Sequence, residues 1–293
     1  MKNTILRVLR PIFLPTPLPA RLRPTLQSRF SWLLPALLLA ATLHGHSQQP
    51  VQTPPASPAQ TPSTLPPPQS GFDFPHAQTL TYEADWRLLP AGTITMHLET
   101  SGNLQHVTVT AATLGSISLL YRVNDRFESV FDRTTGCSQT LTKQTEEGRR
   151  RVNTDIRFDY AQRKQLLSEK NLVKGSAKQA SGSLNACATD ILSAIFYIAS
   201  QSLNPGQTFY FPLADALRVV NVGLKAEARE TLKVPAGPFN TIRVQPTADA
   251  GITRNRGQIW LWYTDDAKHI PVQIKARLFW GTLTFRLTSI ENK

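Results

Sequence analysis

The stretch "TITMHLETSGNLQHVTVTA" (residues 93–111) decides the fold. On either side of its Ser-Gly-Asn centre, apolar and polar residues alternate with a period of two. The apolar positions are Ile94, Met96 and Leu98 before the centre, and Val107, Val109 and Ala111 after it. Such alternation is typical of strands that bury one face, and Gly-Asn pairs favour tight turns. The stretch therefore predicts a β-hairpin with its tip near Gly102.

The same alternation continues along most of the chain beyond Phe72, for example over residues 79–88, 117–131, 220–234 and 282–288. One segment has helical spacing instead, residues 189–203, with Thr189 as the expected N-cap and Asn204-Pro205-Gly206 as the stop. "VPAGPFNTIRVQP" (234–246) places Pro and Gly between two strand-like runs and predicts a turn. We expect a mainly β fold, a curved antiparallel sheet or barrel-like domain covered by one α-helix.

The N-terminal residues have the pattern of an export signal. Six basic residues precede or enter the apolar run "SWLLPALLLAATL" (31–43), and no acid occurs before Asp73. We expect a signal peptide over residues 1–47 and export to the periplasm or cell envelope of a bacterium. Residues 48–71 are rich in proline and predict a disordered linker, which leaves residues 72–293 as a single β domain.

The charge of the chain does not indicate nucleic-acid binding. The net charge is +12, but six of the 32 basic residues and none of the acids lie in the predicted signal and linker. A nucleic-acid-binding domain needs a basic face rather than a basic total, so we expect a solvated surface and no nucleic-acid partner.

The two cysteines, Cys137 and Cys187, allow only one pairing within the chain. In an exported protein an even number of cysteines favours a disulfide. We expect their Cα atoms to lie within about 7 Å of each other, with the bridge fixing the start of the helix to a strand end.

Four stretches resemble a known bacterial family in the order in which they occur: "LTYEADWRLLPAGTITM" (80–96), "DILSAIFYIASQSLNPGQTF" (190–209), "VPAGPFNTIRVQP" (234–246) and "WLWYTDDAKHIPVQIKARLFWGTLTFRL" (260–287). Together they resemble DUF3108, a domain of unknown function found in exported proteins. The additional Trp260 departs from the family pattern near Trp262. The resemblance implies an envelope-located β domain and supplies no catalytic residues.

No motif in the sequence indicates an enzyme, a metal site or a cofactor. Nucleophile elbows, zinc-protease motifs and phosphate-binding glycine loops do not occur. His97 and His106 face solvent across the predicted hairpin, and His269 lies beside Asp265 and Asp266 in a predicted turn; we assign neither group to a metal. We therefore place an enzyme third among the candidate functions, and we predict no catalytic residue.

Two groups of side chains are candidates for ligand binding. Asp125 alternates in phase with Phe127, so it points inward and needs a polar partner, for which Arg243 is one candidate. A buried ion pair and a polar anchor for a ligand are both open. The second group is the tryptophans Trp260, Trp262 and Trp280, which either fill the core or line a cavity.

These observations favour two functions. The first is a non-enzymatic envelope protein that binds a lipid or another apolar or amphipathic ligand inside the β domain, with at most peripheral membrane contact. The alternative is a structural or assembly protein that engages an envelope partner through a sheet edge and the Pro-rich tether.

Overall fold

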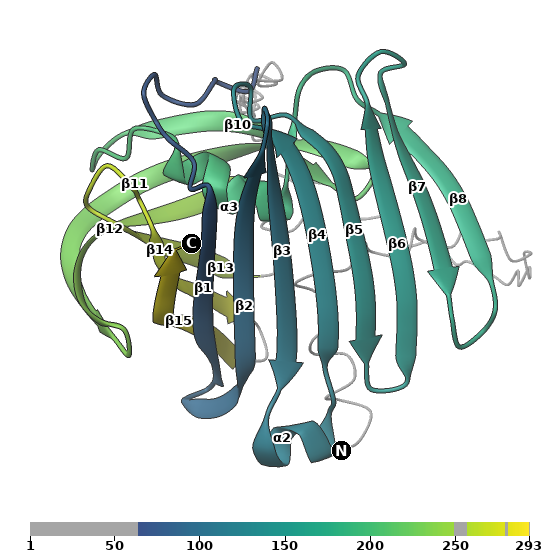
Figure 1. Cartoon of the computed structure of the whole chain (residues 1–293), viewed down its shortest axis with the longest axis horizontal. Helices are drawn as coiled ribbons and strands as arrows, with labels where there is room; N and C mark the ends of the chain where they lie inside the picture. The colour runs from purple at the N-terminus through teal and green to yellow at the C-terminus, as the bar shows by residue number, and fades with distance from the viewer. Residues whose placement is uncertain (1–63, 249–256, 279–280, 293) are drawn as a thin grey trace, which may run out of the picture. The chain divides into compact units, whose positions relative to one another are not determined.

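The computed structural model describes residues 64–248, 257–278 and 281–292. These residues form a single fifteen-stranded sheet and two helices, α2 (Gly115–Leu120) and α3 (Ile191–Ala199), as Figure 1 shows. The strands in chain order are β1 (Ala77–Trp86), β2 (Leu89–Ser101), β3 (Leu104–Thr113), β4 (Asn124–Asp132), β5 (Ser138–Glu147), β6 (Arg150–Asp159), β7 (Lys164–Asn171), β8 (Ala177–Ser183), β9 (Thr189–Asp190), β10 (Thr208–Asp215), β11 (Arg218–Val234), β12 (Gly237–Ala248), β13 (Gln258–Thr264), β14 (Pro271–Leu278) and β15 (Gly281–Asn292).

The sheet consists of two meanders, β1 to β8 and β9 to β15, in which strands that are consecutive along the chain pair with each other. Its order is β8-β7-β6-β5-β4-β3-β2-β1-β15-β14-β13-β12-β11-β10-β9, so β1 pairs with both β2 and β15. All pairs are antiparallel except the short pair of β9 with β10. The predicted hairpin is β2 and β3, with Leu98 opposite Val107, and the predicted turn after Val234 joins β11 to β12. The mainly β, antiparallel prediction is therefore confirmed.

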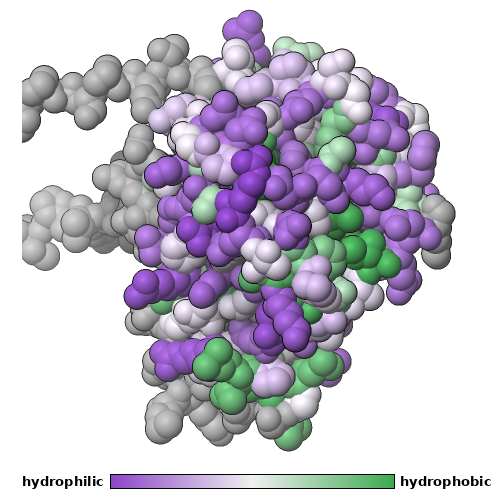
Figure 2. All heavy atoms as spheres, turned by 90° about the vertical axis from the view of Figure 1, so that its left-hand side faces the viewer, coloured by the Kyte–Doolittle hydropathy of each residue, from purple (hydrophilic) through white to green (hydrophobic). Residues whose placement is uncertain are grey.

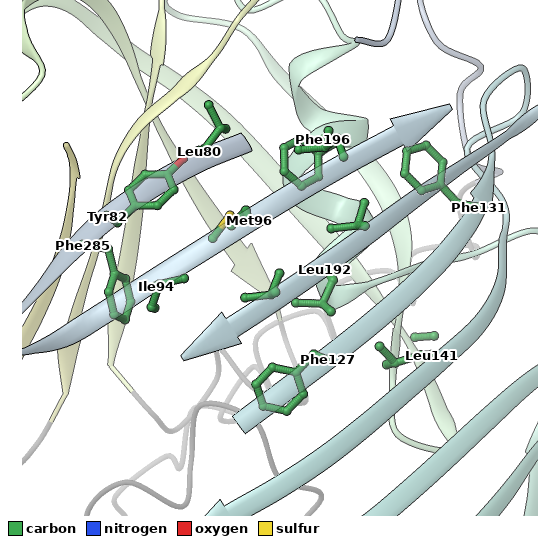
Figure 3. Packing of buried hydrophobic residues seen from close by; sticks show 14 of the residues in the cluster. Leu80, Tyr82, Ile94, Met96, Phe127, Phe131, Leu141, Leu192, Phe196 and Phe285 are labelled. Carbon is green, nitrogen blue, oxygen red and sulfur yellow. The ribbon is translucent and has the colours of Figure 1, made fainter. Parts of the chain in front are cut away.

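The sheet curves around helix α3, which packs against the face that we call the inner face (Figure 1). Leu192 and Phe196 of the helix join a core cluster built mainly from β1 to β7, β14 and β15. Tyr197 and Ile198 join a second cluster built from β10 to β13. Figure 3 shows Phe196 and Leu192 among the side chains of the first cluster. One helix thus supplies apolar contacts to both halves of the sheet, as expected for a covering helix.

Strand β8 and the hairpin of β10 and β11, which belong to opposite halves of the strand order, also contact each other away from helix α3. Gly182 near the end of β8 lies so close to the turn between β10 and β11 that an added Cβ would overlap the carbonyl oxygen of Leu217. Strand β8 makes further contacts with β11. A residue without a side chain is required here because two backbones approach each other directly.

We expect Gly182→Ala to lower the free energy of unfolding by about 1–3 kcal/mol, because the new methyl group forces these backbones apart. Ser181→Ala, at an exposed position on the same strand, is the matched control and should change stability by less than about 0.5 kcal/mol. Urea denaturation of both variants gives the comparison. Equal stability of the two variants would mean that the halves do not meet at Gly182.

Helix α3 is shorter than predicted, and its cap is a different residue. The helix begins at Ile191 and ends at Ala199, within the predicted range 189–203. Asp190 is the N-cap, and its carboxylate accepts hydrogen bonds from the backbone N–H groups of Leu192 and Ser193. Thr189, the predicted cap, lies instead in β9, where it opposes Leu213 of β10. The prediction of Thr189 was wrong because an Asp follows it directly, and Asp caps at least as well.

The stretch 117–131, predicted as one strand, is also divided. Helix α2 occupies its start, and β4 begins only at Asn124. Gly115 at the first position of α2 has a φ of 55°, which turns the chain out of β3. The alternation rule fails here because a six-residue helix is too short to produce a helical pattern of its own.

The end of the Pro-rich segment packs against α3. Leu65 is buried in the second core cluster, and the carbonyl oxygen of Pro66 accepts a hydrogen bond from the Tyr197 hydroxyl at 2.8 Å. The backbone N–H of Gln69 donates to the carbonyl oxygen of Ser200 at 2.9 Å. Ordered packing therefore starts before Phe72, within residues that composition alone assigns to the linker.

Candidate functional site

A buried polar cluster lies where the N-terminus of α3 meets the inner face of the sheet. Asp190 is its centre and is fully buried. Its Oδ1 accepts the two helix N–H groups, and its Oδ2 accepts hydrogen bonds from three serine hydroxyls. These are Ser129 of β4 at 2.5 Å, Ser138 of β5 at 2.5 Å and Ser193 of α3 at 2.8 Å. Five donors therefore hold one carboxylate, which joins the helix to two strands.

The predicted disulfide lies beside this cluster. Cys137 and Cys187 are bonded, and their Cα atoms are 5.2 Å apart, which confirms the prediction. The residues that directly follow the two cysteines are also joined: the backbone N–H of Ser138 donates to the carbonyl oxygen of Ala188 at 3.0 Å. The hydroxyl of Tyr160 donates to the carbonyl oxygen of Ser138 at 2.7 Å. The start of β5 and the segment before α3 are thus joined by a covalent bond and by hydrogen bonds.

Lys143 is a buried lysine on the inner face of β5. Only 9% of its surface is exposed, and it lies in phase with Leu141, which belongs to the first core cluster. Phe127 of β4 and Thr154 of β6 oppose it on the neighbouring strands. Burial lowers the pKa of Lys143, and the negative charges of Asp190 and Asp215 act in the opposite direction. Burial therefore disfavours the charged form of the Lys143 amine, and the two nearby carboxylates favour it.

The inner face around Lys143 carries both apolar and polar side chains. Buried apolar positions of β4 to β7 alternate along the sheet with buried polar ones. The apolar residues are Phe127, Leu141, Ile156 and Leu167, and the polar residues are Ser129, Lys143, Thr145, Thr154 and Gln165. The Oε1 atom of Gln165 is buried without a hydrogen-bond partner among the described residues. This part of the inner face therefore combines apolar contacts with polar groups.

Asp125 is buried on β4, as the alternation predicts, with 4% of its surface exposed. Its Oδ1 accepts a hydrogen bond from the backbone N–H of Glu146 at 2.8 Å. Burial raises the pKa of Asp125 from 3.8 to about 6, although the Glu146 N–H and the nearby positive charge of Arg150 oppose the shift. Asp125 therefore changes its charge within a mildly acidic range.

This shift predicts a pH dependence of stability. Because the pKa of Asp125 is higher in the folded than in the unfolded chain, folding binds a proton between about pH 4 and pH 6. The contribution of Asp125 to stability is fully present below pH 4 and is lost as the pH rises through 6. We expect Asp125→Asn, which keeps the Oδ1 acceptor, to gain about 1–3 kcal/mol relative to the wild type between pH 4 and pH 7.5.

Urea denaturation of wild type and Asp125→Asn at both pH values measures this difference. Asp155→Asn is the control, because Asp155 is exposed on β6. A difference between wild type and Asp125→Asn that stays constant over this pH range would contradict the predicted titration.

The structure does not bring Arg243 to Asp125. Arg243 lies on β12, and its guanidinium forms ion pairs with Glu227 at 2.7 Å and Glu230 at 3.1 Å. The partners of Asp125 come instead from the β5–β6 hairpin. Arg243 and Asp125 are therefore parts of two separate polar groups.

Trp260 and Trp262 also lie away from the inner face. Trp262 opposes Arg243 on β12, and its indole N–H donates to Glu230 at 2.7 Å. Its neighbours Leu261 and Tyr263 point the other way and join the cluster around α3. Trp260 shares the side of Trp262 by alternation and is half-buried. Trp280 lies outside the described residues, so its predicted role stays a prediction.

Sequence reasoning missed both Lys143 and the role of Asp190. A usable signal for Lys143 was present, because it occupies the same phase as Leu141 and Thr145 in an alternating strand. Alternation alone did not lead to a prediction that Lys143 is buried, since lysine is rarely buried in proteins. For Asp190, the sequence could not reveal that three serines from distant segments donate to it.

Two features are absent from residues 64–248, 257–278 and 281–292. No three His, Cys, Asp or Glu side chains come together there in a way that could hold a metal ion. Within the same ranges no helix has both the length and the apolar character needed to cross a membrane.

The fold and this cluster define a class of protein, an antiparallel β-meander curved around one helix with charged groups buried on its inner face. The sequence places the molecule within that class: the chain belongs to the family described as "Protein of unknown function (DUF3108)", which matches residues 81–288. The family resemblance is thereby confirmed. None of the curated proteins compared with the chain matches it.

Two solved structures are similar to this one. The first is a β-barrel-like protein of the domain of unknown function DUF1849 from Brucella abortus. It has 8% sequence identity and a TM-score of 0.51, and the match covers 74% of this chain and 98% of that one. The second is described as a candidate exported protein with a YmcC-like fold from Bacteroides fragilis. It has 6% identity and a TM-score of 0.34, and the match covers 75% and 99% of the two chains. At this identity the first similarity concerns the fold alone.

Proposed function

We propose that this protein is exported to the cell envelope and binds an amphipathic ligand with an acidic head group against the inner face of its sheet. The N-terminal signal pattern and the disulfide support export, because disulfides persist in oxidising compartments. Binding without catalysis is the simplest function for a site that combines a buried lysine with apolar neighbours.

The observation that carries the proposal is the position of Lys143. Burying an ammonium group is costly, and a core built only for stability favours apolar residues at such positions. A ligand carboxylate or phosphate would bind at the Lys143 amine in addition to the contacts that this residue already makes, while Phe127 and Leu141 contact the apolar chain.

The test uses dodecanoate and 1-dodecanol, two probes with the same chain and different head groups. By titration calorimetry, we expect the wild type to bind dodecanoate at least about tenfold more tightly than dodecanol, a difference of about 1.4 kcal/mol. Lys143→Met should abolish this preference. Lys170→Met, which removes an exposed lysine on β7, should retain it. Failure of the wild type to bind dodecanoate, or an unchanged preference in Lys143→Met, would refute the proposal.

A second candidate function, assembly with an envelope partner, is favoured by the end of the sheet. Strand β8 pairs only with β7, and most of its residues are exposed. An edge strand has only one hydrogen-bonded neighbour. The backbone N–H and C=O groups on its other edge can pair with a strand of another protein. A photo-crosslinking residue at Gln179 of β8 should then give a discrete adduct in cells, whereas the same residue at Asp155 should not. Equal labelling at both positions would exclude this candidate.

A further inference from the structure

Exposed apolar side chains gather at one end of the sheet. Leu88 lies in the turn between β1 and β2, and Leu89 begins β2. Leu114 directly precedes α2, and Leu119 lies within it. Leu88 is 94% exposed and Leu119 is 89% exposed. Figure 1 shows this turn and α2 at the lower end of the sheet, and Figure 2 shows hydrophobic side chains at the lower end of a second view. Several highly exposed leucine side chains that occur together usually mark an interaction site.

Backbone contacts connect these segments into one surface, which we call the leucine rim. The N–H of Leu114 donates to the carbonyl oxygen of Ala91 at 3.1 Å, which fixes the start of α2 to β2. The N–H of Gly148, in the β5–β6 turn, donates to the carbonyl oxygen of Arg122 just after α2 at 2.8 Å. The rim therefore comprises residues 86–91, 114–122 and 147–151.

The exposed charges of the rim are all positive. They belong to Arg87, Arg122, Arg149 and Arg151. The one acid within the rim, Glu147, is buried near Arg150, with a distance of 3.7 Å between the charged atoms. Arg122 and Arg149 form no ion pair with any residue that the structure describes. Arg122 and Arg149 are thus available to an external anion, whereas Arg151 pairs with Glu146 at 3.7 Å and Arg87 lies over the ring of Trp86.

The opposite end of the sheet has a different character. Its turns carry small polar residues, such as Gly102 and Asn103 between β2 and β3 and Thr134 and Thr135 between β4 and β5. The disulfide and the start of α3 also lie at this end. Exposed leucines are therefore a feature of the turns at the rim and not of the turns of this protein in general.

We propose that the leucine rim docks on the surface of an anionic lipid bilayer, with its leucines inserted and its arginines at the phosphate groups. The leucines stand on two projecting tips rather than on a flat patch, a shape that fits insertion into a fluid layer better than packing against a protein. Flanking arginines complement anionic head groups, which attract clustered Lys and Arg. This inference goes beyond the proposed ligand binding and does not depend on it.

Vesicle flotation of the full chain tests the proposal. The vesicles contain phosphatidylcholine either alone or with about one-third phosphatidylglycerol. Three double variants are compared with the wild type: Leu88→Ser with Leu119→Ser, Arg122→Ser with Arg149→Ser, and the control Tyr210→Ser with Val219→Ser, which removes exposed apolar side chains on β10 and β11. All four proteins keep the same N-terminal residues, so any contribution of the apolar run 31–43 is common to them.

We expect the leucine variant to bind anionic vesicles at least tenfold more weakly than the wild type, since one buried leucine side chain alone contributes about this factor. The arginine variant should lose about fivefold or more on anionic vesicles and little on neutral ones. The control should bind like the wild type. Equal binding of the leucine variant and the wild type would overturn the proposal. Light scattering that shows a wild-type dimer and a monomeric leucine variant would assign the rim to self-association instead.

Discussion

Replacing both cysteines, as Cys137→Ser with Cys187→Ser, is expected to lower the free energy of unfolding by about 4 kcal/mol. The bridge closes a segment with a sequence separation of 50 residues, and the chain-entropy treatment gives this magnitude for such a loop. The loss should begin at α3, because the disulfide joins the segment before the helix to the start of β5. The strands keep their ladder hydrogen bonds without the bridge, whereas the helix depends on its packed face.

Guanidinium denaturation of the oxidised wild type and the double variant measures the total loss, and amide exchange locates it. We expect amides of α3 to exchange faster in the variant than amides of β1 and β2. The wild type treated with a reductant should behave like the variant. An unfolding free energy within 1 kcal/mol of the wild type, or uniform acceleration of exchange, would contradict the role assigned to the bridge.

Asp190→Ala is expected to cost about 3–5 kcal/mol, the second large effect. The substitution removes the N-cap of α3 and leaves three buried serine hydroxyls without their common acceptor. Buried donors without partners cost about 1–3 kcal/mol each, although the serines can recover part of this with one another, since Ser129 and Ser193 are already 2.6 Å apart. Asp190→Asn should be intermediate, because it keeps one acceptor oxygen and turns a donor toward the hydroxyls.

The matched control is Asp159→Ala. Its carboxylate also caps a turn, accepting the backbone N–H of Gln162 at 2.8 Å, but it lies at the surface and binds no serine. We expect its cost to stay below about 1 kcal/mol in the same urea titrations. If the Asp190 and Asp159 variants lost equal stability, the serine cluster would contribute nothing beyond an ordinary cap.

The sequence predicts the local features of the fold well, because each follows from neighbouring residues. Alternation identifies β2 and β3, and the Pro-Ala pair after Val234 gives the turn to β12. Helical spacing identifies α3, and two cysteines leave one possible pairing. These features depend on a few consecutive residues or on simple counting, so no long-range information is needed.

The candidate site depends on contacts between distant segments, and this is where prediction fails. Alternation predicts that Asp125 is buried but not that its partners lie on the β5–β6 hairpin rather than at Arg243. Alternation places Trp262 and Tyr263 on opposite faces of β13, but it does not indicate which of the two side chains faces α3. Composition assigns Leu65 to a linker, although it packs beside Tyr197. Each answer depends on how a fifteen-stranded sheet curves around α3.

The central claim, that the inner face holds an amphipathic acid beside Lys143, is tested most directly by native mass spectrometry. The full chain is purified without denaturation from the cells that produce it. We predict a bound species of lipid-like mass that extracts as an acid, is present in the wild type and in Lys170→Met, and is lost in Lys143→Met. A wild-type protein that carries no such species, or a Lys143→Met protein that retains it at full occupancy, would contradict the claim.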